Sequence, residues 1–198
     1  GLPVRVRDVR PEALTAALAH AAELLGRKAK RRRTKPAEQR RTLSLLQPTL
    51  EERTLDASDF VVEAIVENLA AKRELLAELG QRLAPTAIVA TNTSSLSIDA
   101  IGERVPHPGR VVGMHFFNPV DRMPLVEVVV GARTDPAAAR AVAAFARRLG
   151  KTPVTVRDGP GFLVNRLLAF YSAEALWLLD EGYRVEEIDQ AMLEWGMP

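Results

Sequence analysis

The segment His115-Phe116-Phe117-Asn118-Pro119-Val120, followed by Glu127, carries the residues of this chain that are best suited to proton transfer. Glu127 lies twelve positions after His115, so a strand that ends at the histidine can pair with a following strand that contains the glutamate. A carboxylate that binds an imidazole fixes the orientation of the ring and makes the histidine a general base. The pair therefore predicts the removal of a proton from an alcohol.

Composition excludes several other kinds of chemistry. The 198 residues include no cysteine and three histidines, which excludes thiolate catalysis and leaves little for a metal site. The sequence has 47% hydrophobic residues, but no apolar run approaches the roughly 18 residues that a membrane helix needs. Its first residues show no secretory signal pattern. We therefore expect a globular, cytoplasmic protein that binds no metal and no membrane.

Positive charge is concentrated in residues 27–41, which hold nine Arg or Lys residues and one Glu. This basic run carries +8, whereas the whole chain carries +2. Such a run is commonly a solvated surface, and that interpretation stays open here. As an anion site it lacks aromatic residues for base stacking, and the chain has no nucleic-acid-binding motif. The run therefore favours a phosphate-bearing small molecule over nucleic acid.

Short β-rich runs alternate with helical periods along most of the chain, which is the pattern of a sheet whose parallel strands are joined by helices. Gly26 and Gly150 are expected to end two of the helices, and Asp135 is expected to cap one. The first two helices should form a hairpin that presents the basic run at its tip. We expect strands at residues 3–9, 60–66, 87–91, 111–115, 125–130 and 152–156, and helices at residues 11–25, 36–46, 68–83 and 136–149.

The pattern changes at Asp158-Gly159-Pro160-Gly161, after which two helices are expected, at residues 162–181 and 185–195. The first of these helices is apolar on more than one face, so a single contact with the sheet cannot bury it. We therefore predict a sheet domain over residues 1–157 and the start of an all-α domain over residues 158–198. A homodimer through the helical domain would cover the remaining apolar surface.

A dinucleotide-binding unit begins with a strand and a Gly-x-Gly-x-x-Gly turn, and these residues contain no such glycine triplet. Asp8 nevertheless ends the strand at residues 3–9, where the second strand of such a unit carries its ribose-binding carboxylate. We therefore expect an α/β fold with a Rossmann-like, mostly parallel sheet whose first strand is absent, in a sequence cropped at both ends. Asp8 favours NAD because a carboxylate repels a 2′-phosphate, while Arg7 and Arg10 leave NADP open.

Four motifs stand in order along the chain: VEAIVEN at residues 62–68, NTSSL at 92–96, HFFNPVDRMPLVEVV at 115–129, and GKTP at 150–153 together with PGFLVNR at 160–166. Taken together, these motifs resemble the 3-hydroxyacyl-CoA dehydrogenase family along nearly the whole chain. The resemblance to multifunctional fatty-acid oxidation alpha subunits, which join this dehydrogenase to an enoyl-CoA hydratase, is closer because of Arg122-Met123-Pro124.

The resemblance implies an oxidoreductase of fatty-acid beta-oxidation that transfers a hydride between NAD and C3 of a 3-hydroxyacyl-CoA. His115 would take the proton of the 3-hydroxyl, and Glu127 would orient the imidazole. The surrounding motif favours this role over that of a buried structural histidine. Ser94 and Asn165 match catalytic positions that hydrogen-bond the substrate, and Asn118 matches a position near the nicotinamide and the substrate. The plain alternatives are a helix N-cap for Ser94 and an Asn-Pro turn for Asn118.

The family positions also imply contacts with the cofactor. Glu67 and Lys72 would border the nicotinamide ribose, and Asn92 would border the nicotinamide itself. As a separate hypothesis, the basic run around Arg31 would meet the phosphates of coenzyme A. Each of these residues has a surface or capping role as its alternative.

Two other functions stay open. A non-catalytic binding or scaffold fragment is one, because a piece without the glycine turn would hold NAD poorly. A related enzyme such as a 6-phosphogluconate or 3-hydroxyisobutyrate dehydrogenase is the other, but these generally use a lysine base. The pair of His115 and Glu127 counts against that second alternative.

Overall fold

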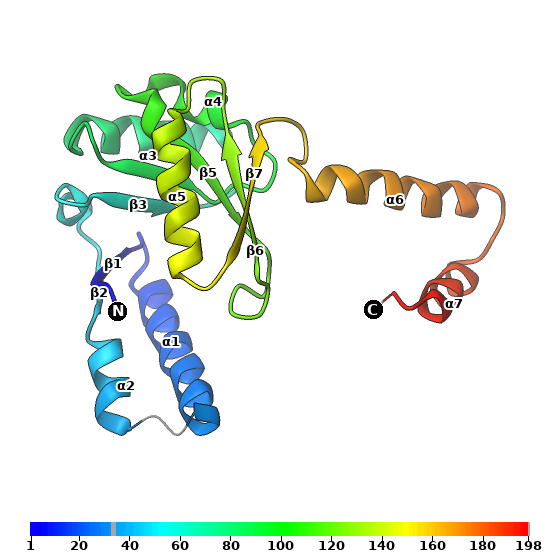
Figure 1. The fold of residues 1–198 in the computed structure, drawn as a ribbon, viewed down its shortest axis with the longest axis horizontal. Coiled ribbons are helices and arrows are strands. Elements are labelled where there is room, and N and C mark those ends of the chain that lie inside the picture. The colour runs from blue at the N-terminus through cyan, green and yellow to red at the C-terminus, as the bar shows by residue number, and fades with distance from the viewer. Residues whose placement is uncertain (33–34, 198) are drawn as a thin grey trace. The chain divides into compact units, whose positions relative to one another are not determined.

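The computed structural model describes residues 1–32 and 35–197, without the side chains of Lys28, Arg31 and Arg32 (Figure 1). The chain forms two compact units. The first unit comprises Gly1–Asp59 with Arg82–Ala84, and the second comprises Phe60–Gln81 with Pro85–Pro198.

The first unit is built on two short parallel strands and a helical hairpin. Strand β1 (Val4–Arg7) pairs with β2 (Leu46–Thr49), and helices α1 (Pro11–Arg32) and α2 (Pro36–Leu43) lie between them in sequence and contact each other. The expected hairpin is therefore present. Its tip, Arg33 and Thr34, lies outside the described residues.

Two details of this unit differ from expectation. Helix α1 does not end at Gly26 but continues to Arg32, because Arg and Lys are good helix formers and Arg27 pairs with Glu23 one turn earlier, at 3.8 Å. Strand β2 was not expected at all. It is short and contains Pro48, which a sheet tolerates on an edge strand, so only its pairing with β1 identifies it.

The second unit contains a five-stranded sheet in the order β3-β4-β5-β6-β7. All neighbours are parallel except β5 and β6, because the loop at residues 117–124 is too short for a helical crossover and can only turn the chain back. The expectation of a mostly parallel, Rossmann-like sheet is confirmed. The strands are β3 (Phe60–Glu63), β4 (Ile88–Thr91), β5 (Val111–Phe116), β6 (Leu125–Val130) and β7 (Thr152–Arg157).

Helix α5 (Pro136–Arg148) packs across this sheet (Figure 1) and forms most of the core with it. The Asp135 side chain caps it by accepting the N–H of Ala137 at 2.9 Å, and Gly150, with φ of 78°, follows its end, as expected. Buried alanines let the helix approach the strands closely. The buried cluster consists of Ala90, Val112, Met114, Val126, Val128, Ala138, Ala139, Val142, Ala143 and Ala146.

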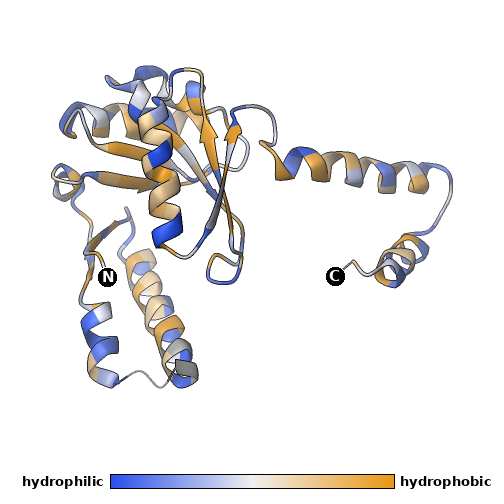
Figure 2. Ribbon diagram, viewed as in Figure 1, coloured by the Kyte–Doolittle hydropathy of each residue, from blue (hydrophilic) through white to orange (hydrophobic). Residues whose placement is uncertain are grey.

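After β7 the chain continues only as helices, α6 (Val164–Asp180) and α7 (Val185–Trp195). No residue of α6 is buried, and Figure 2 shows hydrophobic residues along its whole length. Phe170 and Trp177 are 72% and 61% exposed. The expectation that one contact cannot bury this helix is confirmed, while the predicted domain boundary before Asp158 stays a prediction. Within the described residues, no helix is both long and apolar enough to cross a membrane.

Candidate active site

His115 and Glu127 lie opposite each other on the antiparallel strands β5 and β6. The imidazole Nδ1 and the carboxylate Oε2 are 2.7 Å apart, and both residues are buried. An ionised carboxylate only accepts hydrogen bonds, so this contact assigns the imidazole proton to Nδ1 and leaves the lone pair on Nε2. The predicted pair is therefore formed, and its geometry suits a general base that acts through Nε2.

The second carboxylate oxygen of Glu127 binds the start of α6. Oε1 accepts the backbone N–H groups of Leu163 and Val164, each at 2.9 Å. The first N–H groups of a helix have no partner within the helix, and its N-terminus favours negative charge. Glu127 therefore holds both the histidine and the helix, a second role that the sequence interpretation missed. The signal for it was the Pro160-Gly161 turn just before the helix.

Two aromatic rings flank the imidazole of His115. The ring centroid of Phe117 lies 4.6 Å away and that of Phe162 lies 5.8 Å away with an edge-on arrangement. Phe162 is 2% exposed and has a φ of 49°, a left-handed conformation that costs a residue with a side chain roughly 1–2 kcal/mol. In this conformation the Phe162 ring is buried and packs edge-on against His115. Neither phenylalanine was predicted to belong to the site.

A hydrogen bond from the Asn165 side chain to the Ser94 backbone brings these two residues together. The Asn165 amide Nδ2 donates to the carbonyl oxygen of Ser94 at 3.2 Å. The Ser94 hydroxyl makes no hydrogen bond to any other described residue, and the side chain that caps the nearby helix α4 (Ile98–Ile101) belongs to Ser97. The alternative of Ser94 as a helix N-cap is therefore wrong.

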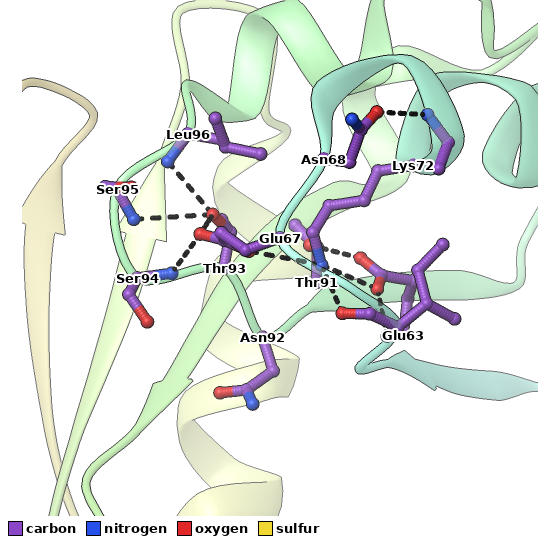
Figure 3. Close-up of polar contacts among 12 residues, drawn as sticks. Glu63, Glu67, Asn68, Lys72, Thr91, Asn92, Thr93, Ser94, Ser95 and Leu96 are labelled. Atoms are coloured by element: carbon purple, nitrogen blue, oxygen red, sulfur yellow. Dashed lines mark hydrogen bonds and ion pairs between the residues drawn. The ribbon is translucent and has the colours of Figure 1, made fainter.

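Glu67 binds the segment that carries Ser94 (Figure 3). Its Oε1 accepts the Thr93 hydroxyl at 2.5 Å and the backbone N–H of Ser94 at 2.8 Å. Partial burial alone would raise the pKa of Glu67, but these two hydrogen bonds and the Lys72 ammonium together lower it below its ordinary value. Glu67 is therefore an ionised carboxylate at an exposed position.

Lys72 lies inside the protein rather than at an open ribose site. On helix α3 (Leu69–Arg82) it is fully buried, and its ammonium donates to Glu63 Oε1 at 2.7 Å and to the Ile65 carbonyl at 3.3 Å. Its distance to Glu67 Oε2 is 3.4 Å. Lys72 therefore pairs with both Glu63 and Glu67. The buried Glu63 was not singled out from the sequence.

Asn92 and Asn118 follow neighbouring strands. Asn92 comes directly after β4, and its Oδ1 accepts the backbone N–H of Phe116 at 3.0 Å, which leaves its amide N–H groups to bind a ligand. Asn118 is exposed in the loop after β5 and precedes a cis bond to Pro119.

Asp8 and Arg31 belong to the first unit, whereas all the other predicted site residues belong to the second. Asp8 directly follows β1, and its Oδ1 accepts the backbone N–H of Arg10 at 2.9 Å. The side chains of Arg31 and Arg32 lie outside the described part of the chain. Over the residues that are described, no group of three His, Cys, Asp or Glu side chains could hold a metal ion.

Two family models match the chain. The model described as "3-hydroxyacyl-CoA dehydrogenase, NAD binding domain" matches residues 1–159, and the model described as "3-hydroxyacyl-CoA dehydrogenase, C-terminal domain" matches residues 161–198.

Curated relatives include fatty acid oxidation complex alpha subunits. The chain is 44% identical to the Shewanella baltica subunit and 42% identical to the Shewanella oneidensis subunit, each over 197 residues. All of this chain is covered in both matches, but it spans only 28% of the length of each relative.

Among solved structures, the chain is similar to 3-hydroxybutyryl-CoA dehydrogenase from Escherichia coli, with a TM-score of 0.87 and 38% identity. That match covers 91% of this chain and 38% of the other. It is also similar to (S)-3-hydroxybutyryl-CoA dehydrogenase PaaH1 from Ralstonia eutropha, with a TM-score of 0.91 and 37% identity. Here the match covers 97% of this chain and 68% of the other.

Proposed function

Because the chain belongs to the 3-hydroxyacyl-CoA dehydrogenase family, we propose that the protein oxidises 3-hydroxyacyl-CoA to 3-oxoacyl-CoA with NAD in fatty-acid beta-oxidation. The observation that carries the proposal is the contact of 2.7 Å between His115 Nδ1 and Glu127 Oε2. It fixes the imidazole tautomer with the proton on Nδ1, which leaves the Nε2 lone pair to act as a general base.

His115 accepts the proton of the 3-hydroxyl at Nε2. NAD, when bound, would supply the acceptor for the hydride on C3. Glu127 stabilises the imidazolium that forms, because its Oε2 already binds Nδ1–H. A positioned general base contributes about 10²- to 10⁴-fold in rate. The rings of Phe117 and Phe162 lie beside the imidazole, which is 5% exposed, so they would limit its contact with water.

Ser94 and Asn165 would bind the oxygen on C3. The Ser94 hydroxyl has no other described partner, and the Asn165 amide, after donating one N–H to the Ser94 carbonyl, retains a second. Neutral donors suit this position because they stabilise charge on the oxygen without competing with His115 for the proton. One such donor is worth about 10²- to 10³-fold in rate.

Two carboxylates, those of Asp8 and Glu67, would bind the ribose hydroxyls of the cofactor. Asp8 follows a parallel strand and uses Oδ1 for Arg10 N–H, so Oδ2 can accept a ribose hydroxyl. Glu67 is ionised and exposed, which suits a second set of hydroxyls. Asn92 and Asn118 would lie beside the nicotinamide. A carboxylate at Asp8 favours NAD over NADP.

The basic run around Arg31 would bind the phosphates of coenzyme A. By analogy with the fatty acid oxidation complex subunits, the full-length protein would also carry an enoyl-CoA hydratase. The exposed apolar residues of α6 support a homodimer, in which a second copy would cover them. The sequence contains no cysteine, which suits the reducing environment of the cytoplasm.

A lysine base, as in related β-hydroxyacid dehydrogenases, is disfavoured by the site. Lys72 is fully buried and donates to Glu63 and to the Ile65 carbonyl, so its amine is occupied and not exposed to a substrate. This supports His115 as the base.

The test is NADH oxidation by the full-length protein with acetoacetyl-CoA. This assay follows the reverse reaction, in which His115 donates the proton. His115→Gln should lower kcat by about 10²-fold or more. His107→Gln, at an exposed histidine between two prolines, is the matched control and should leave kcat unchanged. If His115→Gln retains full activity, the proposed function is wrong.

A further inference from the structure

A set of buried charged and polar groups adjoins the site, and the proposed reaction uses none of its innermost members (Figure 3). Glu63, at the end of β3, is 3% exposed, and Lys72 and Thr91 are fully buried. Glu63 Oε1 accepts from Lys72 at 2.7 Å and from the Ile65 N–H at 2.7 Å, while Oε2 accepts the Thr91 hydroxyl at 2.6 Å. Both oxygens of Glu63 are therefore satisfied.

The charges in this set do not cancel. Two carboxylates, Glu63 and Glu67, face one ammonium, that of Lys72. A buried charge needs a partner with good geometry, and Glu63, with the shorter contact, keeps the Lys72 ammonium fixed. The uncompensated negative charge therefore falls on Glu67, whose side chain is 39% exposed.

Glu67 fixes the conformation of the segment after β4 through hydrogen bonds. The Thr93 hydroxyl that donates to Glu67 also accepts the N–H of Leu96 at 2.9 Å, and so shapes the turn around Ser94. Glu67 fixes Ser94 directly through its N–H. The Ser94 carbonyl in turn accepts from Asn165. A continuous series of contacts thus runs from the core to both residues that would bind the substrate oxygen.

We propose that Glu63 and Lys72 are positioning residues for the reaction. The buried pair holds the Glu67 carboxylate in place, and Glu67 fixes the Thr93–Ser94 segment so that the Ser94 hydroxyl faces the substrate oxygen. This inference rests on the proposed function, because it assigns the series of contacts a consequence for catalysis. A pair that only stabilises the fold would affect stability and leave the turnover of folded enzyme unchanged.

Three variants of the full-length protein separate these two roles. Lys72→Met removes the ammonium and leaves two carboxylates facing each other. Glu63→Gln/Lys72→Met then makes the buried set neutral, which restores stability without restoring the support of Glu67. Arg73→Met is the matched control, because the adjacent Arg73 on α3 pairs with Glu103 at 2.8 Å and donates to Ala100, away from Glu67.

In the assay with acetoacetyl-CoA, Lys72→Met should lower kcat about 10- to 100-fold, the scale of a small misplacement of a reacting group. The double variant should recover the thermal midpoint but not kcat. Arg73→Met should keep the kcat of the wild type. Full recovery of kcat in the double variant, or an equal loss in Arg73→Met, would overturn the proposal.

Hydrogen–deuterium exchange tests the positioning without any activity. The Ser94 N–H should exchange about tenfold faster in Lys72→Met and in the double variant, which is the size of the effect expected when one hydrogen bond to a charged group is removed. It should be unchanged in Arg73→Met. Unchanged exchange at Ser94 in all variants overturns the positioning role. A wild-type enzyme that does not turn over acetoacetyl-CoA overturns the proposed function instead, so the two failures are distinguishable.

Discussion

Glu127 divides its carboxylate between His115 and the first turn of α6. One oxygen lies 2.7 Å from the imidazole Nδ1, and the other accepts the N–H groups of Leu163 and Val164. The residue that orients the proposed base therefore also anchors the helix that carries Asn165. Any change at Glu127 should affect the chemistry and the stability of this unit together.

Glu127→Gln should lower kcat with acetoacetyl-CoA by about 10²- to 10⁴-fold. The amide can present its NH₂ to Nδ1, which then accepts a hydrogen bond, so the imidazole carries its proton on Nε2 and can no longer become a stabilised imidazolium. The thermal midpoint should fall as well, because a neutral oxygen binds the N-terminus of α6 less strongly than a carboxylate.

The matched control for this experiment is Glu103→Gln, at an exposed glutamate that pairs with Arg73. It should leave both kcat and the thermal midpoint close to those of the wild type. A Glu127→Gln enzyme with the kcat of this control would show that the carboxylate does not orient His115.

Glu67 should make the stability of the protein depend on pH. Burial alone would raise its pKa, but Thr93, Ser94 and Lys72 lower the folded-state pKa below the ordinary value of 4.5. A lowered pKa means that the contribution to stability is complete above the ordinary value and is lost as the pH falls through the folded-state value. The free energy of unfolding of the wild type should therefore exceed that of Glu67→Gln at neutral pH.

This difference should shrink as the pH is lowered from about 7 to about 3, measured by denaturant unfolding. Glu74→Gln, at an exposed position on α3 with no hydrogen bond to a described residue, is the control and should show no such trend. A difference between wild type and Glu67→Gln that does not change with pH would contradict the assignment of an ionised Glu67.

The elements with strong local signals could be predicted from the sequence. Strand Leu125–Val130 and helix Val185–Trp195 have the expected bounds, because a proline precedes the strand and a glycine follows the helix. The contact of His115 with Glu127 was also predictable. A loop of fixed length between two apolar runs determines which residues lie opposite each other.

The rest of the site depends on tertiary packing that no local pattern records. Glu63 looked like one polar residue in an apolar strand, and only the packing of α3 brings Lys72 to it. The left-handed Phe162 and the second role of Glu127 likewise depend on where α6 begins relative to β6. Strand β2 is too short to be recognised without its partner.

Charge reversal in the basic run should weaken binding of coenzyme A esters. Arg31→Glu, Arg32→Glu and Arg33→Glu together should raise the KM for acetoacetyl-CoA, by up to about fivefold for each phosphate that an arginine no longer binds, and the effect should decrease with added salt. The Kd of NADH should not change. The control is Arg147→Glu/Arg148→Glu at the exposed end of α5. An unchanged KM in the triple variant would exclude this run as the phosphate site.

Gly161→Ala should destabilise the turn that places Phe162 beside His115. Gly161 has a φ of 70°, and a Cβ there would lie 2.9 Å from the backbone nitrogen of Arg166. The backbone strain costs about 1–2 kcal/mol, and the close approach adds to it. Gly150→Ala is the matched control, because Gly150 has a similar φ of 78° with nothing within 4 Å of the added Cβ. Denaturant unfolding should show a larger loss of stability for Gly161→Ala than for Gly150→Ala, and kcat should fall only in Gly161→Ala. Equal losses of stability with unchanged kcat would show that the close approach at this turn does not support the site.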